Sequence, residues 1–164
     1  MERCQTAFHY DREPELGDLI EISRDNYYKH WAVYVGAGFV VHFVNHSGVS
    51  SGASVHAANG TVRKEKIWDV VGKDKWKINN SMDRQYKPRP ANVIVEDAKA
   101  MVGKELRYDV FSFNCEHFVN KLRYGVAESP QTLHIKNTWK HSKSVFGRQS
   151  LFGTTPGQSK KRNE

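Results

Sequence analysis

The sequence predicts an α+β domain in which an antiparallel sheet is packed with helices. Two observations lead to this class. The first half of the chain contains short segments of alternating apolar and polar residues, separated by turn residues, as expected for half-buried β-strands. The second half contains two segments with apolar residues at helical spacing, so helices and sheet are segregated along the chain. A chain of 164 residues is long enough for one domain with a conventional core.

The strands are expected mainly in the first half. We predict strands over 18–23, 30–36 and 39–44, and a further strand-like stretch over 61–71. A loop rich in Gly, Ser and Ala, from 47 to 60, separates this stretch from the earlier strands. A polar segment follows the last strand-like stretch.

Residues 36–38, Gly-Ala-Gly, form a strong turn signal and join the second and third strands as a hairpin. We interpret them as a three-residue loop, which pairs Val35 with Phe39 and Ala32 with His42. A two-residue loop would shift this register by one position, and such a slip turns every side chain of a strand to the other face. The loop length therefore decides which side chains of the hairpin lie together.

Two histidines of the hairpin are candidates for acid–base chemistry. In the three-residue register, His30 and His42 lie on one face as diagonal neighbours, within reach of each other's side chains. For either histidine alone, a hydrogen-bonded polar residue on a strand is the simpler interpretation. Their shared face, upstream of a cysteine at a helix start, favours a catalytic role.

Two helices are predicted in the second half of the chain. The first runs over 92–102 and ends at Gly103, and a strand-like piece over 106–111 follows it. The second begins after Asn114, whose side chain can accept from free backbone N–H groups, and ends at Gly125, a natural C-cap.

Cys115 would occupy the first turn of this second helix. Unpaired N–H groups and the helix dipole favour an anion there, and such surroundings lower the pKa of a thiol, whose thiolate is the nucleophilic form. Cys115 is therefore a candidate nucleophile that needs a histidine as base. A buried structural cysteine remains the alternative at this point. Cys4 has a dissimilar setting, so no disulfide is expected and a reducing compartment fits.

Two other uses of these residues are less favoured. His117 competes as the base for Cys115, but residues two apart on a helix do not face each other, so we expect a structural role for it. A metal site would combine the pairs His42/His46 and Cys115/His117. The spacing of the first pair suits a helix rather than a strand that ends in a loop, and there is no second cysteine pair. We therefore expect neither a metal nor another cofactor.

Three stretches of the chain resemble a known family. Residues 17–43 are similar to the first motif of the lecithin:retinol acyltransferase-like (LRAT-like) proteins, and more specifically of the phospholipase A/acyltransferase subfamily, also described as Ras-suppressor-like. Residues 67–80 resemble the middle section of that subfamily, and residues 114–127, NCEHFVNKLRYGVA, resemble its cysteine motif. The resemblance extends over residues 14–129, and the two outer motifs have the right order and separation.

This resemblance implies a fold and a role for each site residue. The fold is a circularly permuted papain-like fold, in which the histidines precede the cysteine along the chain. By motif match, Cys115 takes the place of the nucleophile, His30 that of the general base and His42 that of the third residue, which orients the base. The implied reaction cleaves an acyl ester of a glycerophospholipid through a Cys115 thioester, without a metal. Phosphatidylcholine is the implied donor, and water, the amine of phosphatidylethanolamine or a lysophospholipid is the acceptor.

Two further classes of function remain as alternatives. One is a papain-like cysteine peptidase or amidase that uses the same groups, and the other is a non-catalytic module that binds a signalling protein. The set of Cys115, His30 and His42 argues against the module, because an interaction surface does not need these residues. The substrate that is turned over distinguishes the two enzymes.

Charge separates the last part of the chain from the rest. Residues 130–164 contain seven Lys or Arg residues and one acid, a balance of +6 out of +7 for the whole chain. We expect a catalytic domain over 14–129 and a flexible, basic, polar tail over 130–164 that is a candidate contact for anionic membranes. The tail has no apolar run of the roughly 20 residues that cross a bilayer, and the N-terminus has no signal-peptide pattern. We therefore expect a cytoplasmic protein with at most peripheral membrane contact and no nucleic-acid partner.

Overall fold

The computed structural model describes residues 12–24, 28–45, 58–109 and 113–130. The chain divides into two units, Met1–Ser129 and Pro130–Glu164, and the architecture below is that of the first unit. The expectations for the basic tail, for Cys4 and for His46 concern residues outside the described ranges.

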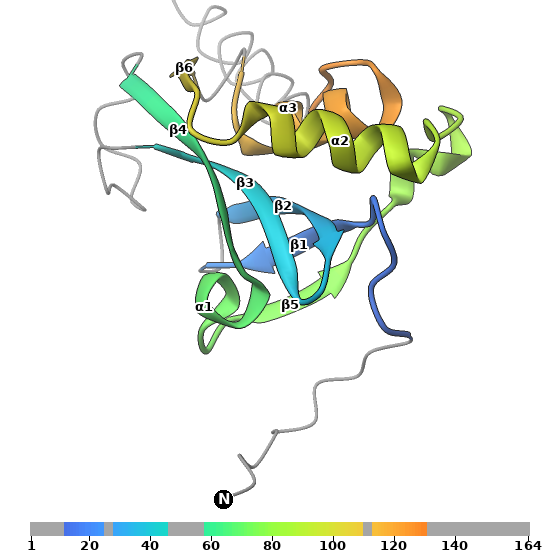
Figure 1. The fold of residues 1–164 in the computed structure, drawn as a ribbon, viewed down its shortest axis with the longest axis horizontal. Coiled ribbons are helices and arrows are strands. Elements are labelled where there is room, and N and C mark those ends of the chain that lie inside the picture. The colour runs from blue at the N-terminus through green and yellow to red at the C-terminus, as the bar shows by residue number, and fades with distance from the viewer. Residues whose placement is uncertain (1–11, 25–27, 46–57, 110–112, 131–164) are drawn as a thin grey trace, which may run out of the picture. The chain divides into compact units, whose positions relative to one another are not determined.

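A six-stranded antiparallel sheet forms the framework (Figure 1). The strands follow the order β5-β1-β2-β3-β4-β6, so β1 to β4 are neighbours both in sequence and in space. Their bounds are β1 Leu19–Ser23, β2 Lys29–Gly36, β3 Phe39–Asn45, β4 Ala58–Lys66, β5 Lys75–Ile78 and β6 Glu105–Tyr108.

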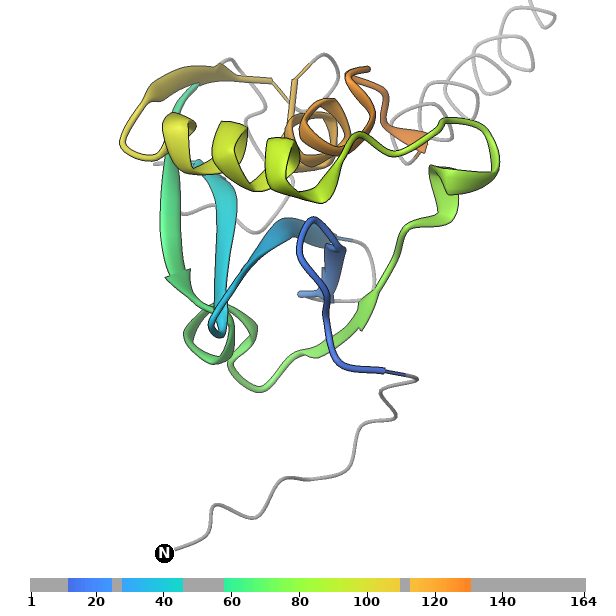
Figure 2. The same ribbon diagram turned by 45° about the vertical axis from the view of Figure 1, so that its right-hand side comes forward.

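Helices cover both sides of this sheet. The described elements are α1 Ile67–Val71, the 3-10 helix η1 Ser81–Arg84, α2 Ala91–Met101 and α3 Cys115–Tyr124. Helices α2 and α3 lie together across one side, whereas the short α1 lies on the other (Figures 1 and 2). The predicted α+β class is confirmed, and both predicted helices form, with α2 displaced by one residue at each end.

The sheet separates two apolar clusters, one on each face. The larger lies beneath α2 and α3, and the smaller lies between the sheet and α1. Members of the larger cluster include Leu19, Val33, Val41, Phe43 and Val119, and members of the smaller include Ile20, Ile22, Ala32, Val40 and Val70. Consecutive residues of a strand point to opposite faces. The central strands are therefore nearly continuous apolar runs, because both of their faces are buried.

The turn of the histidine hairpin is shorter than expected. Ala37 and Gly38 alone form it, and both have positive φ angles, 52° and 77°. Two-residue hairpin turns favour such angles because their twist matches that of the strands. Phe39 pairs with Gly36. The predicted three-residue loop, with Val35 opposite Phe39, is therefore wrong.

A bulge compensates for the shorter turn. The register of β2 and β3 shifts between Tyr34 and Gly36, so β2 contributes one residue more than β3 at this point. Ala32 consequently lies opposite His42, as predicted. A two-residue turn without the bulge would have sent His42 to the other face of the sheet.

The predicted strand over 61–71 consists of two elements. Strand β4 ends at Lys66, and α1 follows it directly. The buried residues of α1, Ile67, Val70 and Val71, follow the i, i+3, i+4 pattern of a helix. The first backbone N–H of α1 donates to a carbonyl of the hairpin turn. This tertiary contact helps to fix the point at which strand gives way to helix.

The polar segment after α1 contains a strand that the sequence analysis did not predict. Strand β5 pairs with β1 at the edge of the sheet. Within it, Trp76 is buried between two exposed lysines, Lys75 and Lys77. The alternation was present in the sequence, but four residues with two lysines are a weak strand signal.

Candidate active site

The N-terminus of α3 is closed by the predicted cap. The Asn114 side-chain oxygen accepts hydrogen bonds from the backbone N–H groups of Glu116, at 2.9 Å, and of His117, at 3.1 Å. In return, Nδ1 of His117 accepts from the Asn114 backbone N–H at 3.2 Å, which completes a capping box. His117 therefore has the structural role that its position predicted.

Cys115 is the first residue of α3, and its side chain lies against β2. Its thiol donates to the Lys29 carbonyl oxygen at 3.8 Å, and its sulfur lies 3.6 Å from the Tyr28 hydroxyl. Burial raises the pKa of Cys115, although hydrogen bonds from Tyr28 and from the Trp31 backbone favour the thiolate. The lowered pKa expected from the helix start is therefore wrong. With 2% of its surface exposed, Cys115 is a neutral thiol at rest.

Two tyrosines lie beside the sulfur. The hydroxyls of Tyr28, just before β2, and Tyr108, in β6, are 3.3 Å apart. Burial raises the pKa of both hydroxyls, so both stay protonated and able to donate. Tyr28 and Tyr108 are far apart in the chain, and only the order of the strands brings them together.

His30 on β2 and His42 on β3 meet, as predicted. Nε2 of His30 lies 2.8 Å from Nδ1 of His42, and the two buried rings are nearly perpendicular, with 80° between their planes. Burial lowers the pKa of His30 to about 3, with further contributions from His42 and Arg24. Burial also lowers the pKa of His42. Both imidazoles are therefore neutral near pH 7.

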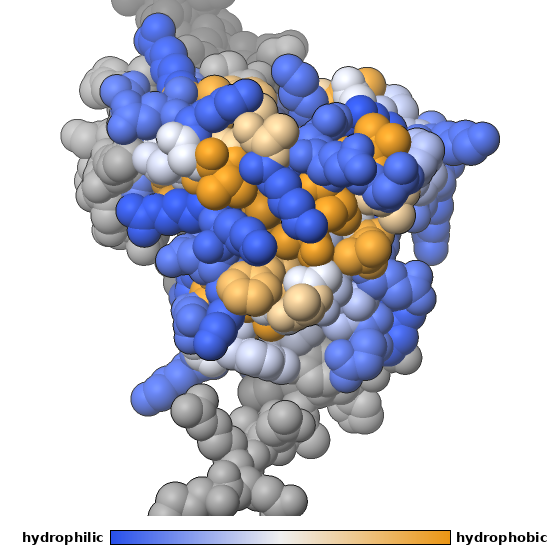
Figure 3. Space-filling view, in the orientation of Figure 1, coloured by the Kyte–Doolittle hydropathy of each residue, from blue (hydrophilic) through white to orange (hydrophobic). Residues whose placement is uncertain are grey.

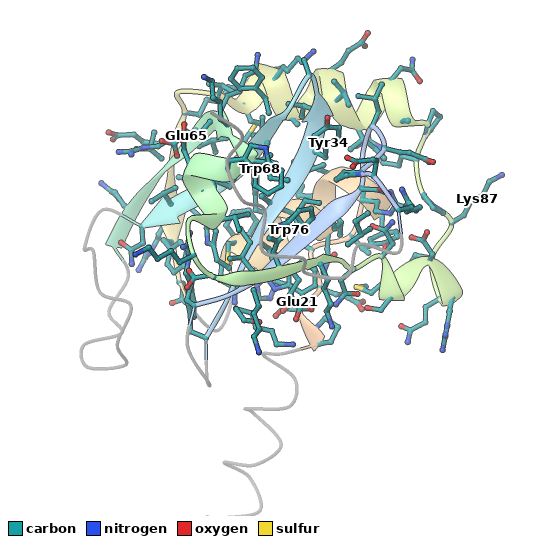
Figure 4. The ribbon with its side chains drawn as sticks, turned by 90° about the horizontal axis from the view of Figure 1, so that it is seen from below. Glu21, Tyr34, Glu65, Trp68, Trp76 and Lys87 are labelled. Carbon is teal, nitrogen blue, oxygen red and sulfur yellow. The ribbon has the colours of Figure 1, made fainter. Side chains whose placement is uncertain are left out.

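A carboxylate on β4 extends the histidine pair. Oε2 of Glu65 lies 2.6 Å from Nε2 of His42, and Figure 4 shows Glu65 on the side of the sheet that carries α1. Glu65 was not predicted from the sequence. The signal appears only when β3 and β4 are paired: Arg63 lies opposite His42, so Glu65, two residues further on, is the diagonal neighbour on the same face.

The sulfur contacts the backbone of β2 at Lys29 and Trp31, on either side of His30, whereas the imidazoles lie on the face of the sheet that carries α1. His30 shares its face with Ala32, which belongs to the smaller apolar cluster, whereas Trp31 packs with Cys115 in the larger one. Within the described part of the chain, no hydrogen bond joins Cys115 to either histidine. The structure thus brings the two histidines together and places Cys115 at the backbone next to His30, on Lys29.

Known proteins match most of the chain. The family model described as lecithin retinol acyltransferase matches residues 12–128. The chain belongs to the lecithin retinol acyltransferase family.

Phospholipase A and acyltransferase 3 of Homo sapiens is 42% identical over 157 residues, which cover 93% of this chain and 96% of the relative. For Phospholipase A and acyltransferase 2 of Homo sapiens, the identity is 43% over 156 residues, covering 92% and 96%. Phospholipase A and acyltransferase 1 of Homo sapiens is 36% identical over 154 residues, covering 92% and 91%. The family resemblance of the three motifs is confirmed.

The described residues contain neither a group of metal ligands nor a membrane-spanning helix. Among the residues whose placement is described, no group of three or more His, Cys, Asp and Glu side chains could hold a metal ion. In the same ranges, every helix is too short or too polar to cross a membrane.

The surface of this lecithin retinol acyltransferase domain includes one prominent aromatic side chain. Trp68 on α1 is 55% exposed, and its ring lies 5.9 Å from that of Trp76 on β5 (Figure 4). In Figure 3, hydrophobic side chains appear between hydrophilic ones on the face seen in Figure 1. The face of the sheet that holds the histidines therefore also carries a tryptophan open to solvent.

Proposed function

We propose that this protein is a thiol-dependent phospholipase A and acyltransferase that acts on glycerophospholipids. One observation carries the proposal: relatives that are named phospholipase A and acyltransferase are 36–43% identical over more than 90% of both chains. The capped cysteine helix and the hydrogen-bonded histidine pair support it, because a thiol nucleophile needs a base and a group that orients the base.

In the proposed reaction, Cys115 is the nucleophile and His30 the general base. Nδ1 of His30 takes the thiol proton, and the sulfur attacks the ester carbonyl carbon of the phospholipid. The tetrahedral intermediate collapses to a Cys115 thioester when the bond to the lysolipid oxygen breaks, and protonated His30 returns its proton to that oxygen. Water, the amine of phosphatidylethanolamine or a lysophospholipid then attacks the thioester and regenerates the thiol.

The charge state of the site suits proton transfer during the reaction. A neutral thiol and a neutral imidazole form no ion pair at rest, so the thiolate arises only as the carbonyl is attacked. A bridging water, or rotation of the Cys115 side chain, would complete the path from the sulfur to His30. The developing oxyanion needs donors, and candidates are the Tyr28 hydroxyl and the Cys115 backbone N–H.

The remaining parts of the proposal concern the chain as a whole. Residues 14–129 form the catalytic domain, with a circularly permuted papain-like arrangement in which His30 and His42 precede Cys115. Residues 130–164 form a basic tail that contacts anionic membrane surfaces from the cytoplasm, since each basic residue near such a surface contributes about 1 kcal/mol. In liposome flotation, the full chain should bind anionic vesicles better than residues 1–129. Equal binding by both would exclude the tail as the contact.

The activity is tested with purified protein and labelled phosphatidylcholine and phosphatidylethanolamine, without added metal. We expect lysolipid together with free fatty acid or N-acylated phosphatidylethanolamine, and loss of all products after thiol alkylation. Turnover of peptide or amide substrates without lipid turnover would favour the peptidase or amidase. A folded protein with neither activity would favour the interaction module.

A further inference from the structure

Glu65 stands at the charged end of a chain of hydrogen bonds that leads to the base. Its carboxylate contacts Nε2 of His42 at 2.6 Å, and Nδ1 of His42 contacts Nε2 of His30 at 2.8 Å. We propose that Glu65 is a positioning residue that sets the tautomer of both histidines and leaves Nδ1 of His30 as the proton acceptor. This inference rests on the proposed function only where it assigns a consequence for catalysis.

The direction of these hydrogen bonds follows from which groups can donate and which can only accept. A carboxylate is an acceptor only, so Nε2 of His42 must carry the hydrogen. A neutral imidazole carries one ring hydrogen, so Nδ1 of His42 is a lone pair and accepts from Nε2–H of His30. The second nitrogen of His30, Nδ1, is then the lone pair. Within the described residues no hydrogen bond occupies it.

These hydrogen-bond directions require both rings to be neutral, and their surroundings keep them neutral. Charged groups reach the pair from two directions: Glu65 and Arg63 from β4, and Arg24 from the segment after β1. Each ring also faces the other across β2 and β3. Burial and the positive guanidinium groups disfavour a second proton on either ring. Glu65 favours the charged form of His42, but the pKa of His42 is still lowered.

The geometry of the sheet accounts for the reach of Glu65. In the antiparallel register, Val40 lies opposite Glu65 and His42 lies opposite Arg63. The diagonal position places the two side chains on one face, at a spacing that a glutamate and an imidazole can bridge. The His42 ring is 5% exposed, whereas the Glu65 side chain is 41% exposed. Water screens the charge of Glu65, so its main effect is orientation rather than electrostatic stabilisation.

A glutamine at this position provides the sharpest test, because it has the same shape but can also donate. If the amide N–H₂ turns toward His42, Nε2 becomes the acceptor and Nδ1 carries the hydrogen. The hydrogen bond to His30 then reverses, and Nδ1 of His30 is protonated. Glu65→Gln is therefore expected to mix or invert the tautomers while it leaves the packing unchanged.

The tautomers are measured by nuclear magnetic resonance on the full chain with ¹⁵N-labelled histidine, at pH 7. Spectra of His30→Gln and His42→Gln assign the two rings by omission. We expect the Nε2–H form for both rings in the wild type and in Glu105→Gln, the control. Glu105 lies on β6 and takes part in no ion pair within the described ranges. Glu65→Gln should shift both rings away from the Nε2–H form, and a spectrum identical to that of the wild type would overturn the proposal.

Kinetics supply the second readout. For Glu65→Gln we expect kcat to fall at least about tenfold with KM within about twofold, since a wrongly set tautomer affects the chemical step. In a His42→Ala background, the same substitution should cause no further loss, because Glu65 acts only through that ring. An equal loss in both backgrounds would overturn the positioning role.

The two proposals fail in different ways. If the wild-type protein turns over no phospholipid but Glu65→Gln still changes the tautomers, the proposed function fails and the positioning of both rings by Glu65 stands. If phospholipid is turned over and the tautomers do not respond to Glu65→Gln, the inference fails and the function stands.

Discussion

The two ends of α3 differ in how their polar groups are satisfied. At the C-terminal end, Nε and Nη2 of Arg123 donate to the Asp83 carboxylate, Nη1 donates to the Gly17 carbonyl, and the Tyr124 hydroxyl donates to the same Asp83. At the N-terminal end, the Cys115 sulfur lies 3.6 Å from the Tyr28 hydroxyl and 3.8 Å from the Lys29 carbonyl, both of them long contacts. The C-terminal end is held by short charged bonds. The N-terminal end is held by the neutral capping box of Asn114 and His117, while its thiol makes long contacts.

This difference separates stability from chemistry on one helix. Burial by itself would raise the pKa of Asp83, but the bonds from Arg123 and Tyr124 outweigh it and lower that pKa. At the other end, burial prevails and the pKa of Cys115 is raised. A helix anchored at its C-terminal end can present a reactive residue at its N-terminal end without relying on that residue for stability. Substitutions at the two ends should therefore have opposite consequences.

The largest effect is expected from Cys115→Ser. If the N-terminal end serves chemistry, this change should lower phospholipid turnover by at least about 10³-fold, as expected for loss of a nucleophile. The free energy of unfolding, measured in urea, should change by less than about 1 kcal/mol, because serine keeps the donor to the Lys29 carbonyl. Full activity in this variant would remove Cys115 from the mechanism.

Next in size is the effect of His30→Gln. Loss of a general base costs about 10²–10⁴-fold in rate, so kcat should fall by that order. His117→Gln is the matched control: glutamine at the third helical position can still complete the capping box, and activity should stay near that of the wild type. The opposite ranking would make His117 the base.

At the C-terminal end, Arg123→Ala should reduce stability and leave the chemistry intact. Arg123 is buried but the Asp83 side chain is 37% exposed, so water screens the pair, and its loss together with the bond to Gly17 should cost about 1–2 kcal/mol. Urea unfolding measures this loss, and turnover per folded molecule should be unchanged. Lys121→Ala, a change of an exposed cation in the same helical turn, serves as control and should cost less than about 0.5 kcal/mol. Loss of turnover in folded Arg123→Ala protein would show that the two ends are coupled.

The smallest expected effect is a pH dependence that separates the histidines from the Arg123–Asp83 pair. The pKa of His30 is lowered to about 3 in the fold, so between that value and about 6.5 the unfolded chain binds more protons than the folded one. The free energy of unfolding should therefore fall as the pH falls from 7 to 5. His30→Gln should show a smaller decrease, whereas Arg123→Ala keeps His30 and should decrease as the wild type does. Equal slopes in all three proteins would mean that His30 does not titrate in this way.

Local patterns predicted the elements that carry the site. Asn114 and Gly125 marked both ends of the cysteine helix, because caps depend on residues adjacent in sequence. The pairing of Ala32 with His42 was also predicted, but through the wrong turn: the two-residue loop and the bulge before Gly36 cancel each other. Two local errors that compensate cannot be detected from alternation alone, since both descriptions place His30 and His42 on one face.

The properties that depend on distant segments were not predictable in this way. The position of Cys115 at a helix start predicted a lowered pKa, whereas burial of its side chain against β2 raises the pKa. Glu65 and Tyr108 reach the site because β4 pairs with β3 and β6 pairs with β4. Neither strand pairing has a signal near His42 or Cys115 in the chain.

By itself, the sequence determined the α+β class, the capped helix that begins at Cys115, the shared face of the two hairpin histidines and the family. Each of these depends on residues that are close in the chain or on motifs with a fixed order. Only the tertiary structure decided the neutral state of the thiol and imidazoles, the carboxylate behind His42 and the position of the sulfur relative to β2. Burial and strand pairing are sums over contacts between remote residues, and protonation states follow from those contacts.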